Sequence, residues 1–341
     1  MPNCYYTCNL VPLDLVARNG YSPRWLGNHL RDGHAPARRE ALSVHPMTCP
    51  FVTKLAAAAD ELLADGLAGH ADDRLVVAGG CDAMRRMGDL LAATHPGRTF
   101  VLPMPRSSGP DVEKRLAADL RRLDEWLARE QTDPGAGSAG ARAEPGAATV
   151  AEPPTVDYPE PPRPGGVFLV AGPLSDDSLL RLIGRLGSHV SGLESCTSPD
   201  RWKPLAPTSG AGAAPEAAGA PADYAALAAR VLETGMCPRR STVERRDHLV
   251  RRLDATRPSS VIYARQSFCD PGAYDALLVA SLAAERHLPY LEIEVDFPFD
   301  ANGPLHTRVE AFLEAQLLDD DLLGDDLRGE LPDGDLFAEE D

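Results

Sequence analysis

The sequence predicts two α/β domains, each built on a doubly wound parallel β-sheet. In both halves of the chain, short apolar runs alternate with stretches of helical periodicity, and turn residues separate them. Short, uninterrupted apolar runs are typical of parallel strands that are buried on both faces. A chain of 341 residues is also longer than one compact hydrophobic core usually supports.

In the first half, two apolar runs predict strands over Arg74–Gly80 and Thr99–Pro105. Helical periodicity is clear over Leu55–Leu67 and Val112–Leu127. The second of these helices places five apolar side chains on one stripe: Val112, Leu116, Leu120, Leu123 and Leu127. A further helix is expected in DAMRRMGDLL, directly after Cys81.

The second half repeats this rhythm. Three clear strands share the apolar pattern: Val167–Ala171, Val261–Phe268 and Tyr290–Asp296. SHVSGLES is a weaker strand, and helices are expected from about Asp177, after Cys237 and over Tyr274–Arg286. Such alternation is typical of Rossmann-like or flavodoxin-like domains, whose ligands collect beyond the carboxyl ends of the strands.

Two low-complexity stretches, rich in Gly, Ala and Pro, divide the chain. They predict an N-terminal domain over residues 1–131, a disordered linker over 132–166 and a C-terminal domain over 167–317. The second stretch is an insertion loop at about 206–222, inside the C-terminal domain. Residues 318–341 form an acidic tail, for which we expect a solvated appendage.

Composition and charge exclude several classes of partner. The net charge of −17 argues against a nucleic-acid partner, because binding to a phosphate backbone needs a basic surface. No apolar run approaches the roughly 20 residues of a membrane span, so no membrane association is expected. The N-terminus lacks the pattern of a signal peptide, and a cytoplasmic location is therefore expected.

The cysteines are the strongest chemical signal. The chain has seven: Cys4, Cys8, Cys49, Cys81, Cys196, Cys237 and Cys269. An odd number without a CxxC pair argues against a disulfide framework and a zinc finger. All except Cys4 lie where a predicted strand ends or a helix begins, and helix N-termini favour thiolates. Any one of them alone fits a small buried apolar residue, but the repeated placement favours an iron–sulfur centre.

Several motifs occur together in one order. They are CNLVPLDLVARNGYSPRWL, CPFVTK, GGCDAMRRMGDLL, LESCTSPDRW, MCPRRSTVERR, SFCDPGAY and, near the end, LPYLEIEVDFP with HTRVEAFLE. With these motifs the chain resembles the 2-hydroxyacyl-CoA dehydratase family, which also includes benzoyl-CoA reductase subunits and double-cubane cluster proteins. The resemblance covers most of the chain outside its low-complexity stretches.

The resemblance implies a 4Fe–4S cluster in the cleft between the two domains. By motif, its ligands are Cys49, Cys81 and Cys269, and one coordination position stays open. It further implies an oxygen-sensitive lyase or reductase that acts on an acyl-CoA through a ketyl radical. An ATP-dependent activator protein supplies the electron, and a homologous second subunit or a homodimer completes the assembly. The resemblance leaves the catalytic residues of this chain unknown.

Two features keep alternatives open. Cys8, Cys196 and Cys237 are additional thiols, which also resemble those of the double-cubane reductases of small molecules. Residues Gly135–Gly166 replace the long inter-domain helical segment of the family, which favours a non-catalytic cluster-bearing partner subunit. Arg85 and Arg86 occupy positions that are often basic in the family. They fit compensation of the cluster charge and a solvated helix face equally well.

Overall fold

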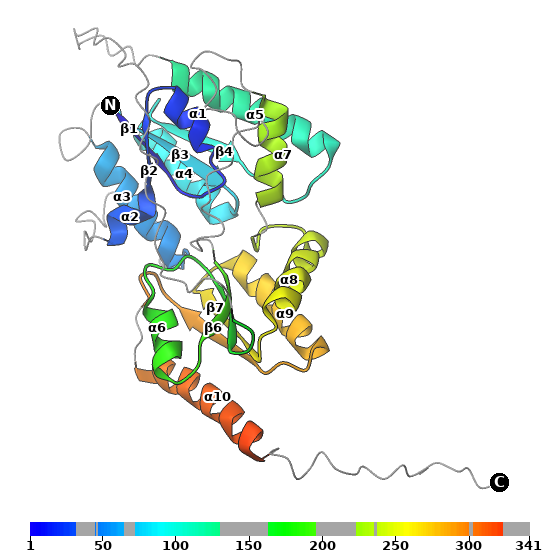
Figure 1. Ribbon diagram of the computed structural model, residues 1–341. Coiled ribbons are helices and arrows are strands. Elements are labelled where there is room, and N and C mark those ends of the chain that lie inside the picture. The colour runs from blue at the N-terminus through cyan, green and yellow to red at the C-terminus, as the bar shows by residue number, and fades with distance from the viewer. Residues whose placement is uncertain are drawn as a thin grey trace.

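The computed structural model describes residues 1–31, 45, 47–64, 72–129, 163–195, 223–234, 237–299 and 303–322. Within these ranges the chain forms two 4-stranded parallel sheets with helices packed around them (Figure 1). The predicted α/β fold class with two doubly wound sheets is therefore confirmed. No helix in these ranges is long and apolar enough to cross a membrane.

The first sheet has the strand order β2-β1-β3-β4. Its strands are β1 (Asn3–Tyr6), β2 (Ser22–Trp25), β3 (Arg74–Gly79) and β4 (Thr99–Pro103). The helices that connect and follow them are α1 (Leu13–Arg18), α2 (Leu26–Arg31), α3 (Pro50–Leu63), α4 (Asp82–Thr94) and α5 (Pro110–Ala128). Every residue of β3 is buried, as expected for a strand that is covered on both faces.

The second sheet has the order β6-β5-β7-β8. Its strands are β5 (Val167–Ala171), β6 (Val190–Glu194), β7 (Ser260–Gln266) and β8 (Tyr290–Val295). Its helices are α6 (Ser178–Arg185), α8 (Thr242–Thr256), α9 (Asp270–Glu285) and α10 (Gly303–Leu322). One core cluster joins this sheet to α6 and α10, and another joins it to α8 and α9.

Both sheets reverse the direction of their strand order at the corresponding position. The order runs outward from β1 to β2 and then returns to β3, and in the second sheet from β5 to β6 and then to β7. In doubly wound sheets, ligands bind at this switch point, beyond the carboxyl ends of the two strands beside it. The residues that follow β1, β3, β5 and β7 are therefore the positions to search for a functional site.

One helix crosses from the second half of the chain to the first sheet. Helix α7 (Tyr224–Thr234) packs against α5, and its apolar side chains enter the core of the first sheet (Figure 1). The Tyr224 hydroxyl donates a hydrogen bond to Asp124 Oδ2 at 2.6 Å. The N-terminal core therefore includes a segment from the range 167–317. The domain limits drawn from the sequence remain a prediction.

Some element boundaries differ from the expected ones. Helix α3 begins at Pro50, earlier than the predicted Leu55, because proline at the first helical position suits the free end of a helix. Helix α10 continues to Leu322, beyond the predicted start of the acidic tail. The predictions for the linker up to residue 162, for the loop at 206–222 and for the rest of the tail fall outside the described residues.

Candidate metal centre

Three cysteines occupy equivalent positions, each directly before the first residue of a helix. Cys49 is the N-cap residue of α3, Cys81 that of α4 and Cys269 that of α9. Cys81 follows β3 and Cys269 follows β7, so both lie beside a switch point. Pro50 and Pro271 in the first turns of α3 and α9 favour the start of a helix at these positions. The local sequence therefore holds each thiol at a helix N-terminus.

The structure brings these three thiols together. The pKa of Cys269 is raised to about 12, chiefly by burial and also by the neighbouring Cys49 and Cys81 thiols. Burial also raises the pKa of Cys81, with added contributions from Cys49 and Cys237. Because such interactions weaken with distance, these four thiols share one neighbourhood. Cys237 thus joins the three thiols that the family resemblance implies.

Backbone amides partly offset the burial of the thiols. The amides of Val52 and Phe51 lower the pKa of Cys49, although burial keeps it above its usual value. Corresponding amides in the first turn act on Cys81 and Cys269. Without metal the thiols are therefore neutral near pH 7, and they release protons when they bind one. The amides at the helix N-termini then stabilise the thiolates.

The site lies where the two sheets meet. Cys49 is part of the core cluster of the first sheet, and Cys269, from the second sheet, packs against that cluster. The rings of Phe51 and Phe297 are in edge-to-face contact beside them, with centroids 4.9 Å apart. Cys49, Cys81 and Cys269, which are distant in the sequence, thus lie in or against one core cluster. Their role as ligands stays a prediction.

The remaining cysteines differ in their surroundings. Cys8 is partly buried after β1 and its thiol lies 3.3 Å from Asn9 Oδ1. Cys4, in the middle of β1, is fully buried, and burial raises its pKa to about 12. Cys196 lies outside the described residues. Cys4 is therefore a packing residue in β1, as its lack of a motif suggested.

The donor set fits an iron–sulfur cluster better than a single metal ion. Within the ranges that the structure describes, no three His, Cys, Asp or Glu side chains are grouped as ligands of one ion. In a cubane, however, each thiolate binds a different iron, so its ligands surround a larger volume. Soft thiolate ligands suit such a cluster.

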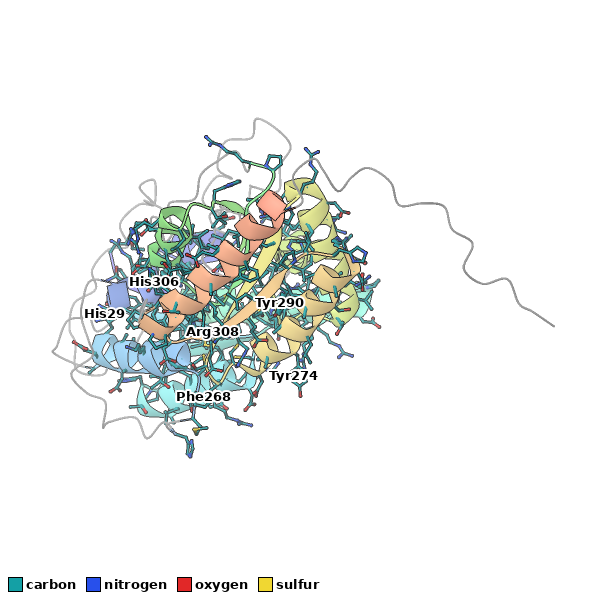
Figure 2. The ribbon with its side chains drawn as sticks, turned by 90° about the horizontal axis from the view of Figure 1, so that it is seen from below. His29, Phe268, Tyr274, Tyr290, His306 and Arg308 are labelled. Carbon is teal, nitrogen blue, oxygen red and sulfur yellow. The ribbon has the colours of Figure 1, made fainter. Side chains whose placement is uncertain are left out.

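A cavity opens beside Cys49. Its volume is about 550 Å³, within the usual range for small-molecule sites. Six of the residues that line it are Met47, Cys49, Asp82, Arg86, Phe268 and Asp270. Phe268, labelled in Figure 2, is 45 % exposed and has a φ of 54°. The cavity gives a small molecule a route to Cys49.

Arginines near the thiols divide into exposed and buried ones. Arg86 is exposed on α4, where it pairs with Asp82 and Asp89, as expected for a solvated face. Arg85 donates from Nε to the Gly79 carbonyl oxygen at 3.0 Å. By contrast, Arg239 is 5 % exposed and Arg240 is 4 % exposed, directly after Cys237. The buried positive charge comes from Arg239 and Arg240. The sequence did not distinguish these two arginines, and the signal it offered was a basic pair directly after Cys-Pro.

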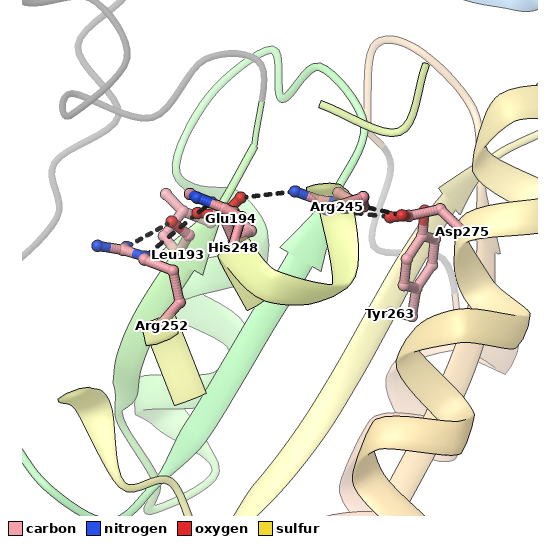
Figure 3. Close-up of polar contacts among 7 residues, drawn as sticks. All are labelled: Leu193, Glu194, Arg245, His248, Arg252, Tyr263 and Asp275. Carbon is pink, nitrogen blue, oxygen red and sulfur yellow. Dashed lines mark hydrogen bonds and ion pairs between the residues drawn. The ribbon is translucent and has the colours of Figure 1, made fainter. Parts of the chain in front are cut away.

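Behind the thiols, a buried polar network joins the elements of the second sheet (Figure 3). Arg245 of α8 donates to both carboxylate oxygens of Asp275 on α9, at 2.9 and 3.0 Å. It also donates to Glu194 at the end of β6, at 3.0 Å. His248, Arg252 and Tyr263 complete the network around the two carboxylates. These contacts fix α9, which begins at Cys269, against α8 and β6.

Comparison with known proteins supports the resemblance seen in the motifs. Residues 161–315 match the family model described as 2-hydroxyglutaryl-CoA dehydratase, D-component. The matched range contains Cys196, Cys237 and Cys269. No curated protein matches the chain.

Proposed function

We propose that this chain, a member of the 2-hydroxyacyl-CoA dehydratase family, binds a 4Fe–4S cluster through Cys49, Cys81 and Cys269. The observation that carries the proposal is that three thiols from distant parts of the sequence share one site, each at a helix N-terminus. The buried cations beside them suit the negative charge of a thiolate-bound cluster.

We further propose that the protein takes part in low-potential, one-electron dehydration or reduction of an acyl-CoA. When bound, the cluster would supply the electron that converts the thioester into a ketyl radical. The chain itself holds the thiols in place, and the cavity beside Cys49 receives the acyl group. Phe268 and Met47 line this cavity and give it apolar surface.

A second candidate is a double-cubane reductase of small molecules. The placement of Cys237 beside Cys81 favours it, because an additional thiol is then available for a second cubane. A cluster-bearing subunit without catalytic activity of its own is the third reading. Iron content and activity together distinguish the three.

Partner proteins are part of the proposal. An ATP-dependent activator would deliver the electron, and a second subunit or a second copy would complete the assembly. Three large apolar side chains are exposed in this region: Phe268 just before α9, and Tyr274 and Leu277 in its first half. Figure 2 labels Phe268 and Tyr274. An exposed apolar group beside Cys269 is what an interface near the cluster needs.

The proposed location is the cytoplasm, where a thiolate-bound cluster is kept from oxidation.

Anaerobic purification followed by iron and sulfide analysis tests the proposed cluster. We expect about four irons per chain, or about eight for a double cubane. Separate Cys49→Ala, Cys81→Ala and Cys269→Ala variants should each lose most of the iron. Cys4→Ala is the control, because Cys4 is a buried thiol that lies within β1 and not at a helix N-terminus. Iron contents unchanged in all three site variants, or zinc in place of iron, would disprove the assignment.

Activity is tested separately. The iron-loaded protein is combined with an activator, ATP and a reductant, and the dehydration of a 2-hydroxyacyl-CoA is followed. Turnover supports the enzyme. An intact cluster without turnover, in the presence of a functional second subunit, favours the non-catalytic reading.

A further inference from the structure

Arg239 lies in the turn between Cys237 and the start of α8, and this turn packs on the loop that follows β4. The Ser241 amide donates to the Arg106 carbonyl oxygen at 2.8 Å. Arg239 itself donates from Nη1 to the carbonyl oxygen of Pro105. These contacts fix the turn against the first sheet and direct the Arg239 side chain inward.

The Arg239 guanidinium group is buried, and no described carboxylate neutralises it. The residue is 5 % exposed, and its Nε and Nη2 atoms have no hydrogen-bond partner among the residues that the structure describes. No carboxylate in the described ranges forms an ion pair with it. The adjacent Arg240 differs, because its Nη2 lies 3.0 Å from Glu244 Oε1. A buried cation with unused N–H groups is costly, so its presence indicates an anion nearby in the functional protein.

Arg239 is adjacent to the thiols. Its side chain lies directly on Gly80, the residue before Cys81, where an added Cβ would come within 2.9 Å of Arg239 Cδ. Cys237, which acts on the pKa of Cys81, is in the same turn. Because Gly80 has no side chain, the Arg239 side chain can pack against it, beside Cys81 at the N-terminus of α4.

We propose that Arg239 is the fixed counter-charge of the cluster held by Cys49, Cys81 and Cys269, and that it sets the reduction potential of that cluster. This inference rests on the proposed function. A thiolate-bound cubane is negatively charged, and reduction adds one more negative charge. A buried cation therefore stabilises the reduced form more than the oxidised form and raises the potential. Arg239 would act through its positive charge on the cluster and needs no contact with the substrate.

The test compares four proteins: the parent, Arg239→Gln, Arg239→Lys and Arg246→Gln. Arg246 is the control, because it lies on the same helix, α8, but is exposed. Each is loaded with iron anaerobically and titrated with reductant, and the reduced cluster is followed by electron paramagnetic resonance. In Arg239→Gln, we expect the ratio of reduced to oxidised cluster at a given potential to fall about tenfold, a downward shift of about 59 mV.

Arg239→Lys should recover most of the potential because it keeps the charge, and Arg246→Gln should match the parent. If Arg239→Gln instead loses its iron while Arg239→Lys keeps it, the need for a charge is supported as well. Equal potentials and equal iron contents in the parent and Arg239→Gln would overturn the inference and leave the cluster proposal intact. Equal loss of iron from both Arg239 variants would show a packing role only, and overturn it too. A parent protein without iron would overturn the proposed function, and this inference with it.

Discussion

Two buried arginines near the start of α8 have opposite surroundings. Arg245 is fully enclosed and binds the carboxylates of Asp275 and Glu194 (Figure 3). Arg239 is nearly as buried, yet it contacts a backbone carbonyl and no carboxylate in the described ranges. The same side chain is thus neutralised in one place and left without a counter-charge in the other.

The difference separates a structural charge from one that is kept for a ligand. Burial opposes the charge of Arg245, but Asp275 and Glu194 outweigh it, and the pKa of Arg245 is raised. Its partners belong to β6, α8 and α9, so the network fixes the elements that surround the thiols. Arg239 contributes little to that framework. Its burial becomes favourable when an anion lies beside it.

The largest effect that this comparison predicts is on the stability of the metal-free protein. Arg245→Met should lower the free energy of unfolding by about 3–5 kcal/mol, because it removes the bidentate partner of the buried Asp275 carboxylate and one partner of the buried Glu194 carboxylate. Arg239→Met should change it by less than about 1 kcal/mol, because the loss of one hydrogen bond is offset by the removal of an unpaired cation. Urea unfolding of the two variants measures both values. Equal losses would contradict the distinction between the two arginines.

The second prediction concerns the coupling of Arg245 with Asp275. Asp275→Leu alone should also be strongly destabilising, because Arg245 then keeps a single carboxylate partner. In the double variant Arg245→Met with Asp275→Leu, the combined loss should be smaller than the sum of the single losses by about 1–3 kcal/mol. A double-mutant cycle in urea gives this coupling. Additive losses would mean that the bidentate contact contributes no stability of its own.

The sequence predicted the fold because its main signals are local. The apolar run of β5 was predicted to the residue, and helices were correctly expected after Cys81 and Cys237. The short strands β1 and β2 were missed, since NCYY and SPRW have only 4 residues each and are stabilised by pairing with their neighbours. The packing of α7 on α5 depends on tertiary contacts that periodicity does not report.

The candidate site was predictable in its thiols and not in its charges. Turn residues and proline mark where a helix begins, so Cys49, Cys81 and Cys269 were recognised at helix N-termini. In the segment PRRSTVERR, however, four arginines look alike. The structure buries Arg239, Arg240 and Arg245 and exposes Arg246. Burial of an arginine is decided by distant segments such as the loop after β4, which the local sequence does not encode.

A third prediction extends the comparison to a group that would become a buried anion. Burial raises the pKa of Cys4 from 9.0 to about 12. The folded state therefore holds the proton more tightly than the unfolded state. The resulting stability is complete below pH 9 and is lost as the pH rises towards 12. In the metal-free protein, Cys4→Ala should make the fall in unfolding free energy over this range less steep. Parallel pH profiles for the parent and the variant would contradict it.

The smallest effect is expected for the exposed pair of Arg246 and Glu285. Its geometry resembles that of Arg245 and Asp275, with two hydrogen bonds of 2.8 and 3.1 Å between guanidinium and carboxylate. Its side chains are 41 % and 44 % exposed, however, so water and salt screen the charges. Arg246→Gln should leave the urea midpoint unchanged within error, at low and at high salt. Because the two pairs differ mainly in burial, a large loss here would show that bidentate geometry, and not the removal of water, makes the Arg245 network stabilising.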